Sequence, residues 1–165
     1  SIGRPATQTM LNKRFLRSVR LMAQCYQSFE RLSGRHLREL GLTPAQFDIV
    51  ATLGNLEGLN FRELGERTLI TKGTLTGVIT RLQGRGLVER FPNPQDGRSE
   101  MLRLTAAGHE LFAQVFPAHV AHCQQAFRDW SGEDFDDLDI RLTRLRDALS
   151  HPAITPADPF PSGTE

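Results

Sequence analysis

Residues 60–105 read NFRELGERTLITKGTLTGVITRLQGRGLVERFPNPQDGRSEMLRLT, and this stretch decides the fold of the chain. Its first half contains two short segments in which apolar residues recur every three or four positions, the spacing of one helical face. Asn60 is placed to cap the first segment and Thr71 the second, because both side chains can accept a hydrogen bond from a backbone N–H. We therefore predict two short helices that meet at a tight corner formed by residues 69 and 70.

The second helix is predicted to have an apolar face and a contrasting polar face. Its inward-facing residues follow the i, i+3, i+4, i+7 pattern and are Leu75, Val78, Ile79 and Leu82. The opposite face, with its flank and its N-terminal end, consists of small and polar residues: Thr71, Lys72, Gly73, Thr74, Thr76, Gly77, Thr80 and Arg81.

Two glycines on this polar face, Gly73 and Gly77, need a reason, since each interior glycine destabilises a helix by about 1 kcal/mol relative to alanine. Close approach to another surface supplies one. A DNA major groove admits an α-helix and presents hydrogen-bond donors and acceptors to it, which suits small residues and hydroxyl groups. We therefore interpret the polar face as a DNA-reading surface. The alternative is a weak helix with a small, solvated outer face.

A hairpin with a basic tip is predicted to follow. Residues 87–91 and 99–104 are strand-like, and residues 92–98 are rich in turn formers. The tip consists of Asp96, Gly97 and Arg98. We expect Arg98 to reach a narrow minor groove, where negative potential attracts arginine, and Asp96 to brace the loop or to orient Arg98. The combined unit is a winged helix-turn-helix, and DNA binding explains it better than a solvated hairpin does.

Two segments of the sequence resemble the MarR family of winged-helix transcription regulators. They are LITKGTLTGVITRLQGRGLVER, residues 69–90, and DGRSEMLRLTAAG, residues 96–108, whose D-x-R and L-T-x-x-G elements are specific in combination. The resemblance extends more loosely over residues 10–149. It implies a homodimer that places one recognition helix of each subunit in double-stranded DNA and that is often tuned by a small ligand.

The composition is that of one globular domain, with 165 residues and a hydrophobic fraction of 39%. We expect no membrane span and no signal peptide, because no stretch is apolar enough for either. Two widely separated cysteines do not suggest a disulfide framework, so a reducing cytoplasm is the simplest location. The net charge of +1 hides an uneven distribution, because the first helix and residues 71–98 are basic whereas acidic residues gather at 129–139.

Helices are predicted on both sides of residues 60–105, the helix-turn-helix and wing, which together are called the reading head. Residues 9–40 carry apolar residues at a spacing of three and four, which predicts a long helix ended by Gly41. Thr43 begins a capping box for the next helix, which we expect to run to about Glu57. Residues 59–61 are a candidate third strand, so the predicted wing has two or three antiparallel strands.

Two further helices are predicted after the wing. The first covers residues 105–130 and should be kinked or broken at Pro117. Ser131 begins the last helix, which brings the total to about six in a mainly α fold. The expected organisation is a disordered N-terminus (1–8), a dimerisation helix (9–40), the DNA-binding region (41–104), C-terminal dimerisation helices (105–149) and a disordered, proline-rich tail (150–165).

The first and last helices carry more apolar surface than a small winged domain can bury. A second copy of the chain would cover these stripes, and two-fold symmetry would place two reading heads about 34 Å apart, one helical turn of DNA. The alternative is that both stripes pack against helix 105–130 within one chain. We favour the dimer.

Residues with catalytic or ligand-binding chemistry form no recognised motif, so we expect neither an enzyme nor a cofactor. His119, His122 and Cys123 lie within two turns of one helix, and His119 and Cys123 could share a metal with Cys25 or His36. We prefer the interpretation that these side chains are partly buried and bind no metal.

Cys25 could have a role in sensing oxidants. Some MarR-like proteins sense peroxides through a first-helix cysteine, but Cys25 lies about two turns too close to residues 40–43 for that role. We therefore expect Cys25 to be a small buried residue.

An effector pocket, by the logic of the resemblance, would involve His36, Phe47 and Phe112, although core packing is the stronger explanation for both phenylalanines. We therefore predict a cytoplasmic, homodimeric, sequence-specific DNA-binding regulator. It would act as a repressor on a pseudo-palindromic operator and be released by a small-molecule effector. The alternatives are a winged-helix module that binds a protein instead of DNA, or a redox- or metal-sensing variant of the regulator.

Overall fold

The computed structural model describes residues 13–151. The predictions for residues 1–8 and for residues 152–165 of the tail therefore lie outside the described part of the chain. The chain divides into two compact units, with the boundary after Gln125.

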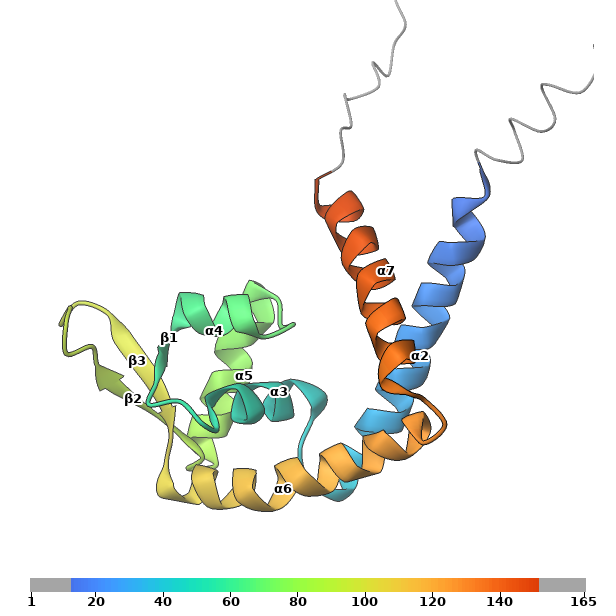
Figure 1. Cartoon of the computed structure of the whole chain (residues 1–165). Helices are drawn as coiled ribbons and strands as arrows, with labels where there is room; N and C mark the ends of the chain where they lie inside the picture. Colours follow the sequence, from blue (N-terminus) through green and yellow to red (C-terminus); the bar gives the residue numbers. More distant parts are fainter. Residues whose placement is uncertain (1–12, 152–165) are drawn as a thin grey trace, which may run out of the picture. The chain divides into compact units, whose positions relative to one another are not determined.

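The first unit contains most of the secondary structure (Figure 1). In chain order its elements are α2 (Phe15–Glu39), α3 (Pro44–Leu53), β1 (Leu59–Asn60), α4 (Phe61–Arg67), α5 (Lys72–Gly84), β2 (Val88–Pro92), β3 (Glu100–Leu104) and α6 (Ala106–Gln124). A short 3-10 helix, η1 (Gln125–Phe127), follows, and α7 (Gly132–Ser150) forms the second unit. Within residues 13–151 these are six α-helices and one three-stranded antiparallel sheet, which confirms the predicted winged helix-turn-helix fold.

Glycines end two of the helices that frame the reading head. Gly41 and Gly86 have φ of 80° and 73°, the left-handed backbone that favours glycine, directly after the last turns of α2 and α5. In each case the next residue, a leucine, donates its N–H back to the last turn: Leu42 to the Leu37 carbonyl and Leu87 to the Leu82 carbonyl, both at 3.0 Å. Gly41 thus terminates the first helix as predicted.

Capping decides where α3 begins, and a turn decides where it ends. The Thr43 hydroxyl accepts from the Gln46 N–H at 3.1 Å, and the Gln46 side chain accepts from the Thr43 N–H at 3.2 Å, so the predicted capping box is present. The predicted end near Glu57 is wrong, because the helix stops at Leu53. Gly54 follows, and the Leu56 N–H bonds to the Leu53 carbonyl at 3.1 Å in a turn that leads into β1.

The sheet has the strand order β1-β3-β2, with both pairs antiparallel. Leu59 pairs with Leu102 of β3, and Val88 of β2 pairs with Leu104. The candidate third strand is therefore present, although it covers only residues 59–60, since Phe61 already starts α4. The Asn60 side chain accepts from the Glu63 N–H at 2.8 Å, as a helix cap does.

One hydrophobic core holds the helix-turn-helix and the wing together. Its most deeply buried members, each with no exposed surface, are Ile49, Leu53, Leu64, Ile79, Leu82 and Leu102. They come from α3, α4, α5 and β3, and burial of such a side chain stabilises the fold by about 1.5–3 kcal/mol. Residues of this core pack against one side of α5 and leave its other side uncovered.

The L-T-A-A-G sequence forms the joint between the wing and α6. Thr105 donates its N–H to the Leu87 carbonyl at 3.0 Å and its hydroxyl to the Gly86 carbonyl, and the same hydroxyl accepts from the Gly108 N–H at 3.0 Å. A Cβ atom at Gly108 would collide with the Leu87 carbonyl oxygen. Only glycine allows α6 to approach the end of α5 so closely.

The prediction for residues 105–130 is correct at its start and wrong at its end. Thr105 caps α6, but the α-helix ends at Gln124 and is followed by η1. Pro117 lies inside α6 without breaking it into two, and Figure 1 shows the helix curving along its length. A proline removes one backbone hydrogen bond, which a helix packed on its neighbours tolerates by bending.

The second unit starts with a capped helix and a cluster of aromatic rings. Ser131 and Asp134 form a reciprocal capping box at the start of α7. The rings of Trp130 and Phe135, on either side of the cap, lie 5.3 Å apart and form a hydrophobic staple, and Phe127 contacts both. Between residues 13 and 151 no helix combines the length and the apolar character that a membrane crossing needs.

Large apolar side chains remain exposed on α2 and α7. Phe15, Leu16, Leu21, Tyr26 and Phe29 each leave between 46% and 59% of their surface exposed. The buried residues of α2 are confined to its C-terminal part, and α7 has none. Within the first unit, α6 therefore leaves most of the α2 stripe uncovered, so for α2 the alternative of packing inside one chain is wrong.

Candidate nucleic-acid interface

The polar face of α5 lies on the outside, as predicted. Leu75, Val78, Ile79 and Leu82 are buried in the core. The eight residues assigned to DNA contact are all exposed: Thr71, Lys72, Gly73, Thr74, Thr76, Gly77, Thr80 and Arg81. The period of the sequence thus separates the two faces correctly.

No packing contact among residues 13–151 requires glycine on this face. A Cβ atom built on Gly73 or Gly77 would meet no other atom within 4 Å. Gly54 is the opposite case, since a Cβ atom there would overlap the ring of Phe112. Packing within the chain therefore requires a glycine at position 54. It does not require one at position 73 or 77.

The Thr71 hydroxyl does not cap α5 as predicted. Thr71 is the residue before the helix, but its side chain caps no backbone N–H and donates instead to the Thr74 hydroxyl at 3.1 Å. Thr80 donates to the Thr76 carbonyl at 2.9 Å. The predicted cap at Thr71 is wrong, and the first N–H groups of α5 lack a side-chain acceptor among the described residues. Such a helix end attracts phosphate oxygens.

The tip of the wing is built around Asp96. Its carboxylate accepts from the Arg98 N–H at 3.1 Å, and its carbonyl accepts from the Ser99 N–H at 3.1 Å. Asn93 donates its N–H to the Ser99 carbonyl at 3.0 Å and closes the loop. Asp96 therefore braces the loop, one of the two roles predicted for it, and Gly97 and Arg98 are exposed at the tip.

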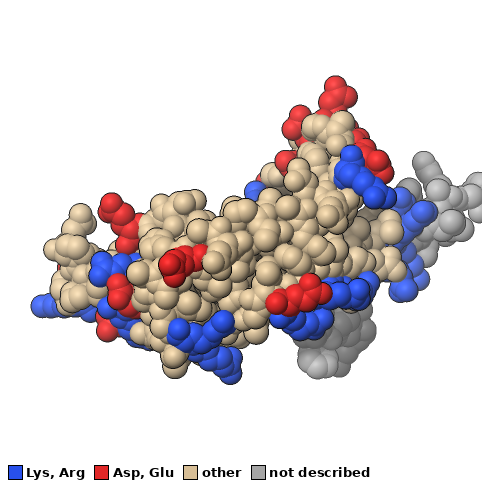
Figure 2. Space-filling view, turned by 90° about the horizontal axis from the view of Figure 1, so that it is seen from below, with Lys and Arg blue, Asp and Glu red and all other residues tan. Residues whose placement is uncertain are grey.

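Basic residues of this region fall into two groups. Arg90 pairs with Glu100 at 2.9 Å, and Arg103 pairs with Glu89 at 2.7 Å while its guanidinium lies over the ring of Phe91. Lys72, Arg81 and Arg98 make no ion pair within residues 13–151. Around the wing, at the left of Figure 2, basic and acidic side chains are accordingly interspersed. The unpaired group is the one suited to phosphates.

Arg85 holds the C-terminal end of α5 to another part of the unit. Its Nη1 donates to the Gly41 carbonyl at 2.9 Å and to the Gln46 side chain at 3.2 Å. Gln46 is itself buried in the capping box of α3. The sequence places Arg85 among the basic residues of the reading head, whereas these contacts give it a structural role.

The three residues predicted for an effector pocket belong to one cluster of rings. Nδ1 of His36 lies 2.9 Å from Nδ1 of His119, whose ring lies at 4.7 Å, edge-on, from that of Phe47. Phe112 joins through Phe116, with ring centres 5.1 Å apart. His119 and Phe116 connect the predicted residues and were not among them; their spacing on one face of α6 is the signal that could have found them.

His119 is buried and uses both ring nitrogens. Its Nε2 lies 2.9 Å from the Ser33 hydroxyl and 3.5 Å from the Cys123 sulfur. Burial lowers the pKa of His119 below its usual value, and the neighbouring charges of His36 and His122 lower it further. Burial also raises the pKa of the Cys123 thiol.

Neither cysteine nor the histidines build a metal site. Within residues 13–151 no group of three or more histidine, cysteine, aspartate or glutamate side chains has the geometry to hold a metal ion. Cys123 is partly buried, whereas Cys25 is exposed. The expectation of a buried Cys25 is wrong, because its side chain is exposed on α2, whose buried residues all lie further toward the C-terminal end of the helix.

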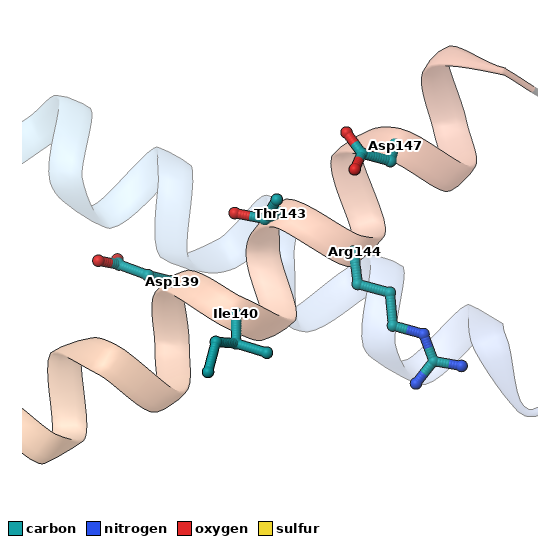
Figure 3. A pocket seen from close by; sticks show the side chains of 5 residues that line it. All are labelled: Asp139, Ile140, Thr143, Arg144 and Asp147. Atoms are coloured by element: carbon teal, nitrogen blue, oxygen red, sulfur yellow. The ribbon is translucent and has the colours of Figure 1, made fainter.

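A shallow hollow on α7 is lined by Asp139, Ile140, Thr143, Arg144 and Asp147 (Figure 3). All five residues lie on one face of a single helix, at spacings of one, three and four positions. The hollow is therefore a strip of exposed helix surface, without the convergent polar groups of an enclosed ligand site.

Comparisons with known proteins agree with this geometry. A model of the MarR family matches residues 42–99, which include α3 to the wing tip. HosA, a transcriptional regulator of Escherichia coli O111:H-, is 30% identical over 122 residues, which cover 73% of this chain and 90% of HosA.

Solved structures share the fold over most of the chain. A mutant of MarR from Escherichia coli, in complex with operator DNA, has a TM-score of 0.71 and 25% identity, covering 81% of this chain and 96% of that one. BpsR of Bordetella bronchiseptica, whose DNA binding is regulated by 6-hydroxynicotinic acid, has a TM-score of 0.70 and 25% identity, covering 78% and 92%.

Proposed function

The chain belongs to the MarR family of winged helix-turn-helix transcription regulators, and on this basis we propose that it is a repressor that binds a pseudo-palindromic operator as a homodimer. Family membership confirms the predictions of a DNA-binding regulator and of a protein that is not an enzyme. The assignment of individual residues, the dimer and the effector is our proposal.

The exposed glycine-threonine face of α5 carries the proposal for the DNA contacts. Gly73 and Gly77 have open space where a Cβ atom would be, and the core fixes the opposite side of the helix. A rigid helix with a low outer surface can lie deep in the major groove, where threonine hydroxyls reach base edges. Lys72 and Arg81 would contact phosphates, and Arg98 would enter the minor groove from the wing.

The exposed apolar surfaces of α2 and α7 support the homodimer. Side chains such as Phe15 and Tyr26 leave more than half of their surface uncovered in one chain. Contiguous apolar surface of this kind is a liability on a monomer and is usually covered by a partner. A two-fold axis between these helices would give a palindromic operator with half-sites about 34 Å apart.

The ring cluster around His119 supports a small aromatic effector that releases the DNA. Phe47, Phe112 and Phe116 supply apolar ring faces, while His36 and Ser33 supply hydrogen-bonding groups beside them. The cluster joins α2, α3 and α6, so a ligand there would change how α2 and α6 pack. Such a ligand shifts the protein away from DNA only if it binds the DNA-incompetent arrangement more tightly.

Selection of duplexes from a random-sequence DNA library tests the proposal. The recovered site should be palindromic, and sedimentation of the complex should give two chains for each duplex. Affinity, measured by fluorescence anisotropy, should fall steeply between about 50 and 200 mM salt while the preference for the selected site remains. Binding that is equally weak to every duplex would refute a sequence-specific regulator and favour a module that binds a protein.

A further inference from the structure

Leu69 is an apolar side chain held out in solvent at the corner of the helix-turn-helix. It exposes 88% of its surface, more than any other large apolar side chain in the described part of the chain. Its two neighbours behave differently: Thr68 is buried, and Ile70 packs against the core. Single exposed leucines are common, so the exposure alone carries no function.

The backbone around Leu69 is fixed from several sides. The Leu69 N–H donates to the Asp48 carboxylate of α3 at 2.9 Å. Thr68 donates both its N–H and its hydroxyl to the Leu64 carbonyl, at 3.0 and 2.9 Å. The side chain therefore points outward because the corner is anchored there, and a flexible loop is not the explanation.

The position of the corner suggests what Leu69 contacts. It precedes Thr71, at the N-terminal end of α5, and the N-terminal residues of a recognition helix are those that meet base edges. The major groove offers one apolar group, the 5-methyl of thymine, which pairs with apolar side chains. We propose that Leu69 packs against a thymine methyl in each half-site and so determines specificity. This inference rests on the proposed function.

Replacing single thymines by deoxyuridine tests the contact, because this removes the methyl group and leaves the hydrogen-bonding edge unchanged. The duplex is the one selected by the wild-type protein, substituted at one symmetric pair of thymines at a time. We expect one pair to weaken wild-type binding about four-fold per half-site, the factor for one buried methyl group. The variant Leu69→Ala should bind the thymine duplex more weakly and be indifferent to deoxyuridine at that pair.

A conservative variant separates packing from damage to the corner. Leu69→Met keeps an apolar side chain of similar volume and should restore the thymine preference. The non-additivity of protein and DNA changes measures the contact directly. Since the side chain is exposed, thermal unfolding of all three proteins should coincide.

The outcomes distinguish this inference from the proposed function. If the wild-type protein binds no duplex specifically, the proposed function fails and this inference fails with it. If it binds its site but is insensitive to deoxyuridine at every thymine, or if Leu69→Ala keeps the full preference, only the role of Leu69 is refuted.

Discussion

Glycines in two regions of this protein serve opposite purposes. On the outer face of α5, a Cβ atom at Gly73 or Gly77 would stand in open space. At Gly54 and Gly108, the same atom would collide with Phe112 or with the Leu87 carbonyl. The second pair is explained by the chain's own packing, whereas the first pair has no such explanation and is the pair that we propose to lie against DNA. A glycine in a sequence thus becomes informative once its surroundings are known.

The largest expected effect comes from filling the space beside α5. Replacing Gly77 with glutamine should lower operator affinity at least about 100-fold, since a long side chain would hold the helix out of the groove. Fluorescence anisotropy with the selected duplex measures it. Gly84→Gln is the matched control, because Gly84 is also exposed on α5 with open space around it but lies outside the proposed contacts. Equal affinities for the two variants would contradict the deep-groove arrangement.

Substitution of a glycine that is packed against other parts of the chain should lower the stability of the protein. Gly108→Ala forces a Cβ atom against backbone and should lower the free energy of unfolding by about 2 kcal/mol, as overpacking does. Urea unfolding gives the value. Gly132→Ala, at the open first position of α7, is the control and should not lower stability. A stable Gly108→Ala protein would show that α6 and the end of α5 can separate without cost.

Two arginines of the wing offer a similar comparison, because Arg98 makes no ion pair among the described residues and Arg103 makes one. Arg98→Ala should weaken operator binding about ten-fold with the fold intact, because it removes a proposed minor-groove contact. Arg103→Ala should leave DNA affinity within about two-fold, as its guanidinium is engaged by Glu89 and Phe91. Titration of both variants at one salt concentration checks the difference. The reverse order of effects would mean that Arg103 leaves its partners to contact DNA.

A smaller substitution at Gly77 should separate folding from binding. Gly77→Ala should raise the free energy of unfolding by about 1 kcal/mol, since alanine is the better helix former and nothing crowds its methyl group. Operator affinity should fall at the same time. Thermal unfolding and anisotropy on one preparation test both. A gain in stability with no loss of binding would place Gly77 away from the DNA surface.

The smallest effect concerns pH. Because the pKa of His119 is lowered in the folded protein, the unfolded chain binds more protons just below the usual histidine value of 6.5. Stability should therefore decrease as the pH falls from 8 through about 6.5 to 6. Urea unfolding across this range should show the slope, and His119→Gln should flatten it. An unchanged slope in that variant would assign the dependence to other groups.

Local spacing accounts for what could be predicted from the sequence. The faces of α5 follow from a repeat of three and four, and the caps at Thr43, Thr105 and Ser131 from residues within one turn. Contacts between distant segments could not be predicted in this way. The bonds of Arg85 to Gly41 and Gln46, and the place of His119 between Ser33, His36 and Phe47, join positions about 40 to 86 residues apart.

The errors have the same origin. Thr71 precedes a helix as a capping residue would, but its hydroxyl turns to the neighbouring Thr74. α3 ends earlier than predicted, because the turn after Leu53 interrupts an apolar pattern that continues in the sequence. Burial of Cys25 is expected from its residue type alone, but it is exposed on α2.

The joint at Thr105 has a mechanical consequence. One hydroxyl and one N–H tie the root of α6 to the residues that end α5 and begin the wing, with no spacer between them. A tilt of α6 cannot be absorbed at this point and has to be passed on to α5 and the hairpin together. In the proposed homodimer, changes in the packing of α6 against α2 would therefore alter the distance between the two reading heads, while the shape of each head stays the same.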